Sequence, residues 1–74
     1  MLRWFVKVGD LVVFIDEGTY AKWFFGRMGV VQRYTPKGAD GLPYCNVKWL
    51  QPTKYFDGYT AASSFKASCF KVLK

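Results

Sequence analysis

The residues with the clearest chemical potential lie between positions 19 and 27, where aromatic rings are interleaved with positive charges. The segment contains four aromatic and two basic side chains: Tyr20, Lys22, Trp23, Phe24, Phe25 and Arg27. Rings beside positive charges suit a single-stranded nucleic acid, whose bases stack and whose phosphates pair with cations. They equally suit an acidic protein surface that is anchored by an aromatic or arginine side chain. A structural alternative also stands, in which Trp23 and Phe25 fold over the core as a small second core.

The remaining positive charge is spread along the chain and forms no single basic run. The 74 residues carry a formal net charge of +6. Residues 1–17 hold two basic and three acidic side chains, whereas residues 18–74 hold nine basic and two acidic ones. Such an excess favours anionic partners, although dispersed lysines also serve solubility. We predict one partner-binding surface made of the following residues: Tyr20, Lys22, Trp23, Phe24, Arg27, Arg33 and Lys48.

Catalytic chemistry has little support in this sequence. The chain has no histidine, which is the commonest general base and metal ligand. Its five acidic residues are scattered through turns, mostly beside glycine, and no carboxylate pair stands out. The stretch Gly26–Gly29 lacks the Gly-Lys-Ser/Thr ending of a phosphate-binding loop. We therefore predict that the protein is not an enzyme and has no cofactor, no metal ion and no small-molecule substrate.

The two cysteines, Cys45 and Cys69, are too few for a disulfide scaffold. Each lies in an apolar stretch, so we predict two small buried thiols, while a disulfide between them stays open. Arg3 and Lys7 interrupt the apolar N-terminus before a signal-peptide core can form. The longest apolar run, Leu11–Ile15, is far shorter than the roughly 20 residues of a membrane span. We expect a soluble, cytoplasmic protein.

A single fold must position these residues, because a chain of 74 residues is long enough for only one small domain. We predict that this domain spans residues 1–74. Hydrophobic residues make up 51% of the chain, which argues against disorder. Short apolar runs bounded by Gly, Pro and Asp predict five strands: Leu11–Ile15, Gly29–Tyr34, Tyr44–Leu50, Tyr59–Ala62 and Phe70–Leu73. Residues 16–28 and 35–43 are expected to be loops. Pro52 is expected to end the third strand, because proline cannot donate to a sheet ladder.

Packing within this fold follows from the alternation of side chains along a strand. Cys45, Val47 and Trp49 share one face of the third strand. Four aromatic residues are expected to fill the barrel: Phe14, Trp49, Phe65 and Phe70. Residues 62–73 fit either a helix or a turn followed by a strand, because apolar residues recur there at helical spacing. We favour a short helical turn over 65–68 and then a strand, since the preceding strands must close their edges.

Two short motifs resemble those of small SH3-like barrels. Lys7–Val12 is similar to the glycine–aspartate turn that opens such domains, and Met28–Val31 resembles the start of the second strand in KOW-type barrels. A longer resemblance, over most of residues 8–73, is to the small stromal barrel protein of photosystem I and to related ferredoxin-docking subunits. It rests on the following residues: Tyr20, Trp23, Phe24, Gly29–Val31, Tyr44, Val47–Trp49, Tyr55, Gly58, Ser64, Phe65 and Val72. The chain departs from that pattern in having Trp49 in place of phenylalanine and a longer 35–43 loop.

The element order and the resemblance together predict an all-β fold, a single SH3-like barrel of about five strands with a short helical turn near the C-terminus. In the photosystem family, the basic barrel docks an acidic redox protein and carries no cofactor. Small phage and bacterial proteins open in the same way. We therefore predict a non-enzymatic docking module that binds an acidic protein partner within a larger assembly through its basic, aromatic loop. Two alternatives stay open: a nucleic-acid-binding KOW-like barrel, and a small structural subunit of a capsid or complex.

Overall fold

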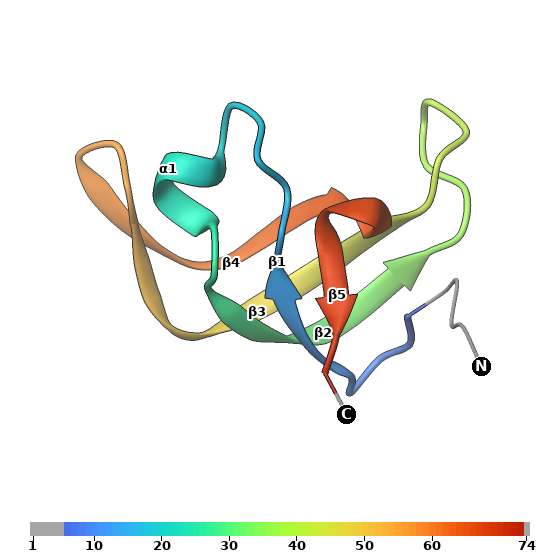
Figure 1. Ribbon diagram of the computed structural model, residues 1–74. Helices are drawn as coiled ribbons and strands as arrows, with labels where there is room; N and C mark the ends of the chain where they lie inside the picture. Colours follow the sequence, from blue (N-terminus) through green and yellow to red (C-terminus); the bar gives the residue numbers. More distant parts are fainter. Residues whose placement is uncertain (1–5, 74) are drawn as a thin grey trace.

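The structure is a computed structural model that describes residues 6–73. Over these residues, five strands, one α-helical turn and one 3-10 turn follow one another along the chain (Figure 1). Their bounds are as follows: β1 Leu11–Phe14, α1 Ala21–Phe24, β2 Met28–Thr35, β3 Tyr44–Tyr55, β4 Gly58–Lys66, η1 Ala67–Cys69 and β5 Phe70–Val72. The expected all-β class, with five strands and a helical turn near the C-terminus, is confirmed.

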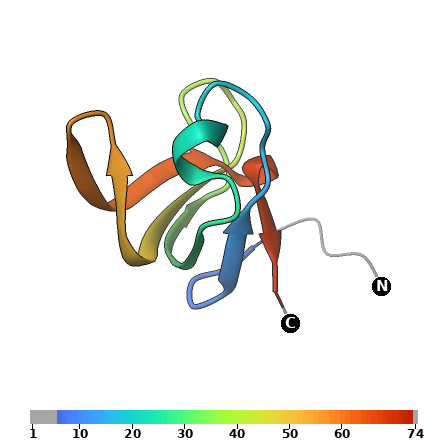
Figure 2. The same cartoon turned by 60° about the vertical axis from the view of Figure 1, so that its left-hand side comes forward.

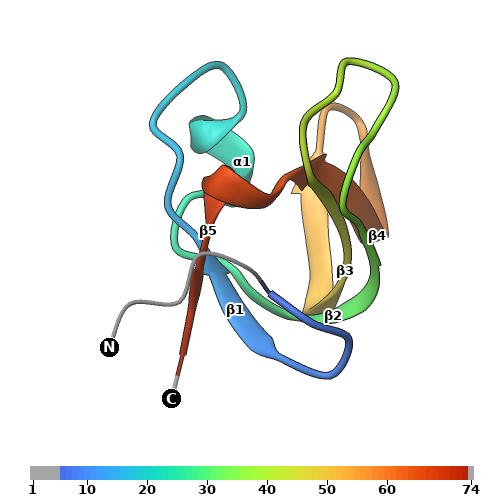
Figure 3. The same ribbon diagram turned by 90° about the vertical axis from the view of Figure 1, so that its right-hand side faces the viewer.

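The strands form one antiparallel sheet in the order β4-β3-β2-β1-β5. β1 lies between β2 and β5, so the first and the last strand of the chain are neighbours. The β3–β4 hairpin projects from one side of the fold, and α1 lies beside it (Figure 2). We call the tip of this hairpin, residues 53–60, the arm; its strands pair from Thr53–Thr60 to Tyr55–Gly58. The sheet is strongly bent, and α1 and η1 lie on its concave side (Figure 3).

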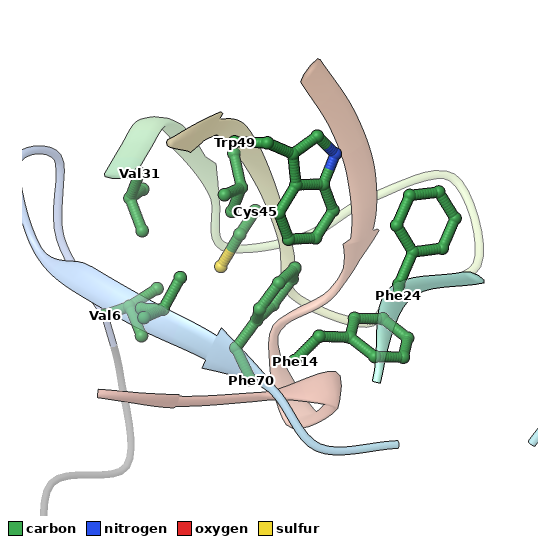
Figure 4. Close-up of a cluster of buried hydrophobic side chains, with 9 residues drawn as sticks. Val6, Phe14, Phe24, Val31, Cys45, Trp49 and Phe70 are labelled. Carbon is green, nitrogen blue, oxygen red and sulfur yellow. The ribbon is translucent and has the colours of Figure 1, made fainter. Parts of the chain in front are cut away.

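Side-chain alternation gives the bent sheet a buried concave face (Figure 4). The buried hydrophobic residues form one cluster: Val6, Val12, Phe14, Phe24, Val31, Cys45, Val47, Trp49 and Phe70. The expected shared face of Cys45, Val47 and Trp49 is confirmed, and Phe65 packs at the margin of this cluster. The indole Nε1 of Trp49 donates a hydrogen bond to the Ser63 hydroxyl at 3.0 Å. The largest core ring therefore keeps its polar atom satisfied.

Gly29 allows β2 and β3 to approach closely at the centre of the core. It pairs with Trp49 across the two strands. A Cβ atom at this position would lie 2.6 Å from the carbonyl oxygen of Lys48 and would also overlap the side chain of Val47. The glycine that opens the predicted second strand is therefore needed for packing.

The third strand is longer than expected, and the prediction that Pro52 ends it is wrong. β3 runs to Tyr55, and β4 is correspondingly longer than the predicted strand over 59–62. Trp49 is the last residue of β3 that pairs with β2. The part of β3 that contains Pro52 therefore lies beyond β2 and has only β4 as a neighbouring strand. The register between β3 and β4 also shifts between Lys48 and Thr53. A proline is tolerated there because an irregular ladder does not require its missing N–H.

The C-terminal region follows the favoured alternative of a helical turn and then a strand. The turn is η1, two residues later than expected, and β5 follows it directly. A continuous helix over residues 62–73 is therefore wrong. The tertiary context explains this outcome, since Val12 and Phe14 of β1 pair with β5 and bury Phe70 against the core.

The loop predicted over residues 16–28 contains α1, which is four residues long. Among residues 6–73 no helix has the length and apolar character that a bilayer crossing requires. Both Cys45 and Cys69 are free thiols. Burial raises the pKa of Cys45 to about 11, and it raises the pKa of Cys69 as well.

Candidate aromatic binding site

The short helix α1 divides the aromatic residues of its segment between the core and the surface. The amide groups of Trp23 and Phe24 both donate to the carbonyl of Tyr20 at 3.1 Å. Phe24 turns inward, is 1% exposed, and stacks on Trp49 at 5.1 Å between ring centroids. Gly26 follows with a φ of 81°, a conformation that glycine adopts without strain, and leads the chain into β2.

A second set of rings lies at the margin of the core, where α1 meets the arm, and two of them, Trp23 and Tyr55, pack against the core. We call Tyr20, Trp23, Tyr55 and Phe56 the aromatic cluster. The Trp23 ring lies 5.0 Å from Tyr55, 4.6 Å from Phe56 and 6.3 Å from Tyr20. The rings of Tyr55 and Phe56 are 4.5 Å apart. Two segments more than thirty residues apart in sequence therefore build one aromatic surface.

Phe56 holds the tip of the arm in an unusual backbone conformation. Its φ of 54° lies in the left-handed region, and Phe56 is the one non-glycine residue of the described chain found there. Glycine or asparagine normally occupies such a turn position, because a bulky side chain makes this conformation costly. Phe56 is nevertheless 61% exposed. Backbone strain that presents an exposed ring is a feature associated with functional sites.

Positive charge accompanies the aromatic cluster on one side. The Lys22 ammonium lies 4.4 Å from the centroid of the Trp23 ring, within the range of a cation–π interaction. Burial raises the pKa of Tyr55, and the neighbouring Tyr20 raises it further, so Tyr55 stays neutral well above physiological pH. The cluster can therefore offer apolar area, hydroxyl groups and one ammonium group to a ligand.

The seven residues predicted as one partner-binding surface do not form one surface. Tyr20, Lys22 and Trp23 come together in or beside the aromatic cluster, as described above. Phe24 is a core residue, because its ring packs against Phe14 and Trp49 and leaves no area for a partner.

The other predicted residues lie elsewhere. Arg27 is exposed where the chain enters β2, and its backbone bonds with Phe14 and Phe24. Arg33 pairs with Asn46, and Lys48 pairs with Val30, so both belong to the sheet face opposite the core. Lys48 must point away from Phe24, because its neighbour Trp49 points toward it.

Sequence reasoning missed Tyr55 and Phe56 as members of the site. A signal was present, because the Asp57-Gly58 pair between two strand-like runs indicates a hairpin, although the structure places the turn one residue earlier, at Phe56 and Asp57. Treating Pro52 as the end of the third strand hid this hairpin, and the approach of the arm to α1 depends on tertiary structure.

Among residues 6–73 no three Cys, Asp, Glu or His side chains lie close enough to hold a metal ion. The Asp40 carboxylate accepts hydrogen bonds from the Tyr44 hydroxyl at 2.7 Å and from the Leu42 amide at 3.0 Å. Both bonds lower the pKa of Asp40, and the bond between Tyr44 and Asp40 raises the pKa of Tyr44. The two bonds serve the closure of the 36–43 loop.

Comparison with known proteins gives no match for this chain, whether against family models, curated proteins or solved structures. What the site can bind is therefore inferred from its own geometry.

Proposed function

We propose that this protein is a non-enzymatic docking module that binds an acidic protein partner within a larger assembly through the aromatic cluster and Lys22. One observation carries this proposal. Phe56 adopts a strained left-handed conformation, remains 61% exposed, and lies 4.6 Å from the Trp23 ring on a different segment. A ring that served folding alone would gain little from that position, whereas a ring that anchors a partner gains exposed area at a fixed place.

The electrostatic balance supports an acidic partner. Lys22 lies at the cluster. The five strands of the described residues contain five basic residues and no acidic residue. Such a field favours encounter with an acidic surface, and aromatic anchors then hold the partner in place.

A nucleic acid is the second candidate, because exposed rings beside a lysine also suit base stacking. The ring geometry favours a protein. Trp23 and Tyr55 pack edge to face at 76°, and Lys22 lies over one face of the Trp23 ring. Base stacking needs a free ring face, whereas a protein side chain can fill the angle between two rings.

The proposal is tested by quantitative capture with the immobilised chain. Loss of a central anchor costs about 2 kcal/mol or more, which lowers affinity roughly 30-fold. We therefore expect the double variant Phe56→Ser/Lys22→Glu to lose the acidic partner that the unmodified chain retains. The matched control is Leu42→Ser/Lys37→Glu, which changes an exposed leucine and an exposed lysine in the 36–43 loop.

Equal capture by both double variants would overturn the assignment of the site. Fluorescence anisotropy with single- and double-stranded oligonucleotides over a series of salt concentrations separates the second candidate. Binding that weakens steeply with salt, and that is lost in Phe56→Ser/Lys22→Glu, would favour a nucleic acid over a protein.

A further inference from the structure

The face of the sheet opposite the core is apolar and cationic, which is unusual for the outer face of an antiparallel sheet. We call it the outward face. One row across the strands joins Leu11, Val30 and Lys48. The next row joins Lys71, Val13 and Met28.

Three large apolar side chains of the outward face are substantially exposed. Leu11 is 37% exposed and Met28 is 44% exposed. Leu50, one residue beyond the Gly29–Trp49 pair and therefore beside Met28, is 55% exposed. Contiguous exposed apolar area of this kind marks interaction surfaces more often than isolated apolar residues do.

The charged side chains that the strands place on this face have one sign. Lys48 and Lys71 lie within the two rows, and Arg33 lies on the same face opposite Asn46. The acidic residues of the chain all lie outside the strands, in turns and connections: Asp10, Asp16, Glu17, Asp40 and Asp57. A second copy of the chain would therefore bring like charges together, whereas an acidic apolar partner would complement this face.

The backbone of the outward face limits the form of the partner. β1 and β2 each have a paired strand on both sides, so they offer no free edge here. A partner that lies across β1 and β2 must therefore bind through side chains and satisfy its own backbone, as an α-helix does. The side chains in the two rows are aliphatic or cationic, so base stacking has no ring to use there.

We propose that the outward face binds an acidic amphipathic helix, with Leu11, Met28 and Leu50 contacting its apolar stripe and Lys48 and Lys71 pairing with flanking carboxylates. This site is separate from the aromatic cluster, and it goes beyond the proposed function. The protein would then have two docking surfaces, on opposite sides of the same core.

The test uses the isotopically labelled chain and a synthetic helical peptide. The peptide carries leucines three and four residues apart with glutamates beside them, and a matched peptide carries lysines in place of the glutamates. We expect the acidic peptide to cause saturable NMR shifts at Leu11, Val30 and Leu50, and the basic peptide to cause none. In Lys48→Glu the dissociation constant should rise about tenfold, as expected for loss and reversal of one close interfacial charge pair.

Matched controls keep the outcomes distinct. Lys37→Glu and Leu42→Ala, in the 36–43 loop, should bind the acidic peptide as the unmodified chain does. Phe56→Ser should also bind the acidic peptide normally. The outcome of this test therefore does not depend on whether the aromatic cluster is a binding site.

Several outcomes would overturn the inference. One is the absence of saturable shifts on the outward face with the acidic peptide. Another is equal binding of both peptides. A third is selective binding of this face to phosphatidylglycerol vesicles in place of the peptide, and a fourth is concentration-dependent self-association through the face in sedimentation experiments.

Discussion

The two connections at the ends of β3 differ in how they use their side chains. The 36–43 loop before β3 turns its polar groups inward on itself: Asp40 accepts bonds from Leu42 and Tyr44, and the Gly38 amide donates to the Leu42 carbonyl at 2.8 Å. The turn after β3 does the reverse, because Phe56 adopts a left-handed conformation and presents an exposed ring. The first connection satisfies its own groups, and the second exposes groups that a partner can use.

The contrast between these connections indicates where binding is expected in a small β domain. A loop whose polar groups bond to one another keeps fewer free donors and acceptors for a ligand, even though it lines an open pocket together with Thr35 and Tyr44. A strained turn whose ring rests on Trp23, from a separate segment, has both a fixed position and free area. The aromatic cluster, and not the longer loop, is therefore the better candidate site.

The largest expected effect is a difference in stability between loss of the core ring of α1 and loss of the exposed ring of the arm. Phe24→Ala should lower the free energy of unfolding by about 3–5 kcal/mol, because it removes a fully buried ring. Phe56→Ala should change it by less than about 1 kcal/mol, since most of that side chain is exposed. Urea denaturation measures both. Comparable losses would show that Phe56 belongs to the fold, which would remove the distinction between the two regions.

The next effect concerns backbone strain at the tip of the arm. Phe56→Gly should be more stable than Phe56→Ala by about 1 kcal/mol, because glycine adopts a φ of 54° without a Cβ penalty. Thermal unfolding measures the stability of both variants. Neither variant keeps the phenyl ring, so a difference between them reports on the backbone conformation. Equal stability, or a more stable alanine variant, would mean that the turn is not strained.

A smaller, local effect is expected in the 36–43 loop. The pKa of Asp40 lies below its ordinary value of 3.8 because Tyr44 and Leu42 donate hydrogen bonds to it. A lowered pKa means that the carboxylate stabilises the loop above pH 3.8 and loses that contribution as the pH falls through its folded pKa. Hydrogen exchange of the Leu42 amide should therefore accelerate in Asp40→Asn, while the arm is unaffected. Acceleration in both regions would show that the loop does not close independently.

The weakest effect should be seen at the two cysteines, which lie in or against the core. The pKa of Cys45 is raised to about 11 by burial, so the thiol is protonated at neutral pH. Burial raises the pKa of Cys69 in the same direction. Alkylation by iodoacetamide at pH 7 should therefore be slow at both positions, and reaction followed by mass spectrometry checks it. Rapid labelling of Cys45 in the folded chain would mean that the shared core opens readily.

Much of the sheet could be predicted from alternation and turn residues. The buried face of Cys45, Val47 and Trp49 follows from a period of two, and the filling role of Phe14 and Phe70 follows from their apolar runs. The length of β3 could not be predicted, because the effect of Pro52 depends on the neighbouring strands and on the register at that point.

The candidate site was predicted in part. Tyr20, Lys22 and Trp23 were found from composition, because rings and charges were adjacent in sequence. Phe24 could not be separated from Trp23 without the geometry of α1, which turns one ring inward. Phe56 joins the site through the arm, and that contact depends on how two distant segments pack.

Site-specific photo-crosslinking in the cell from position 56 asks directly whether the aromatic cluster holds a partner. A photoreactive benzoylphenylalanine at position 56 keeps an aromatic ring at the tip of the arm, and the same group at position 42 reports on the 36–43 loop. A docking role for the cluster predicts a discrete crosslink from position 56 to an acidic protein, lost in Lys22→Glu, and none from position 42. Crosslinks of equal yield from both positions, or none from position 56, would contradict the claim that the aromatic cluster is a docking surface.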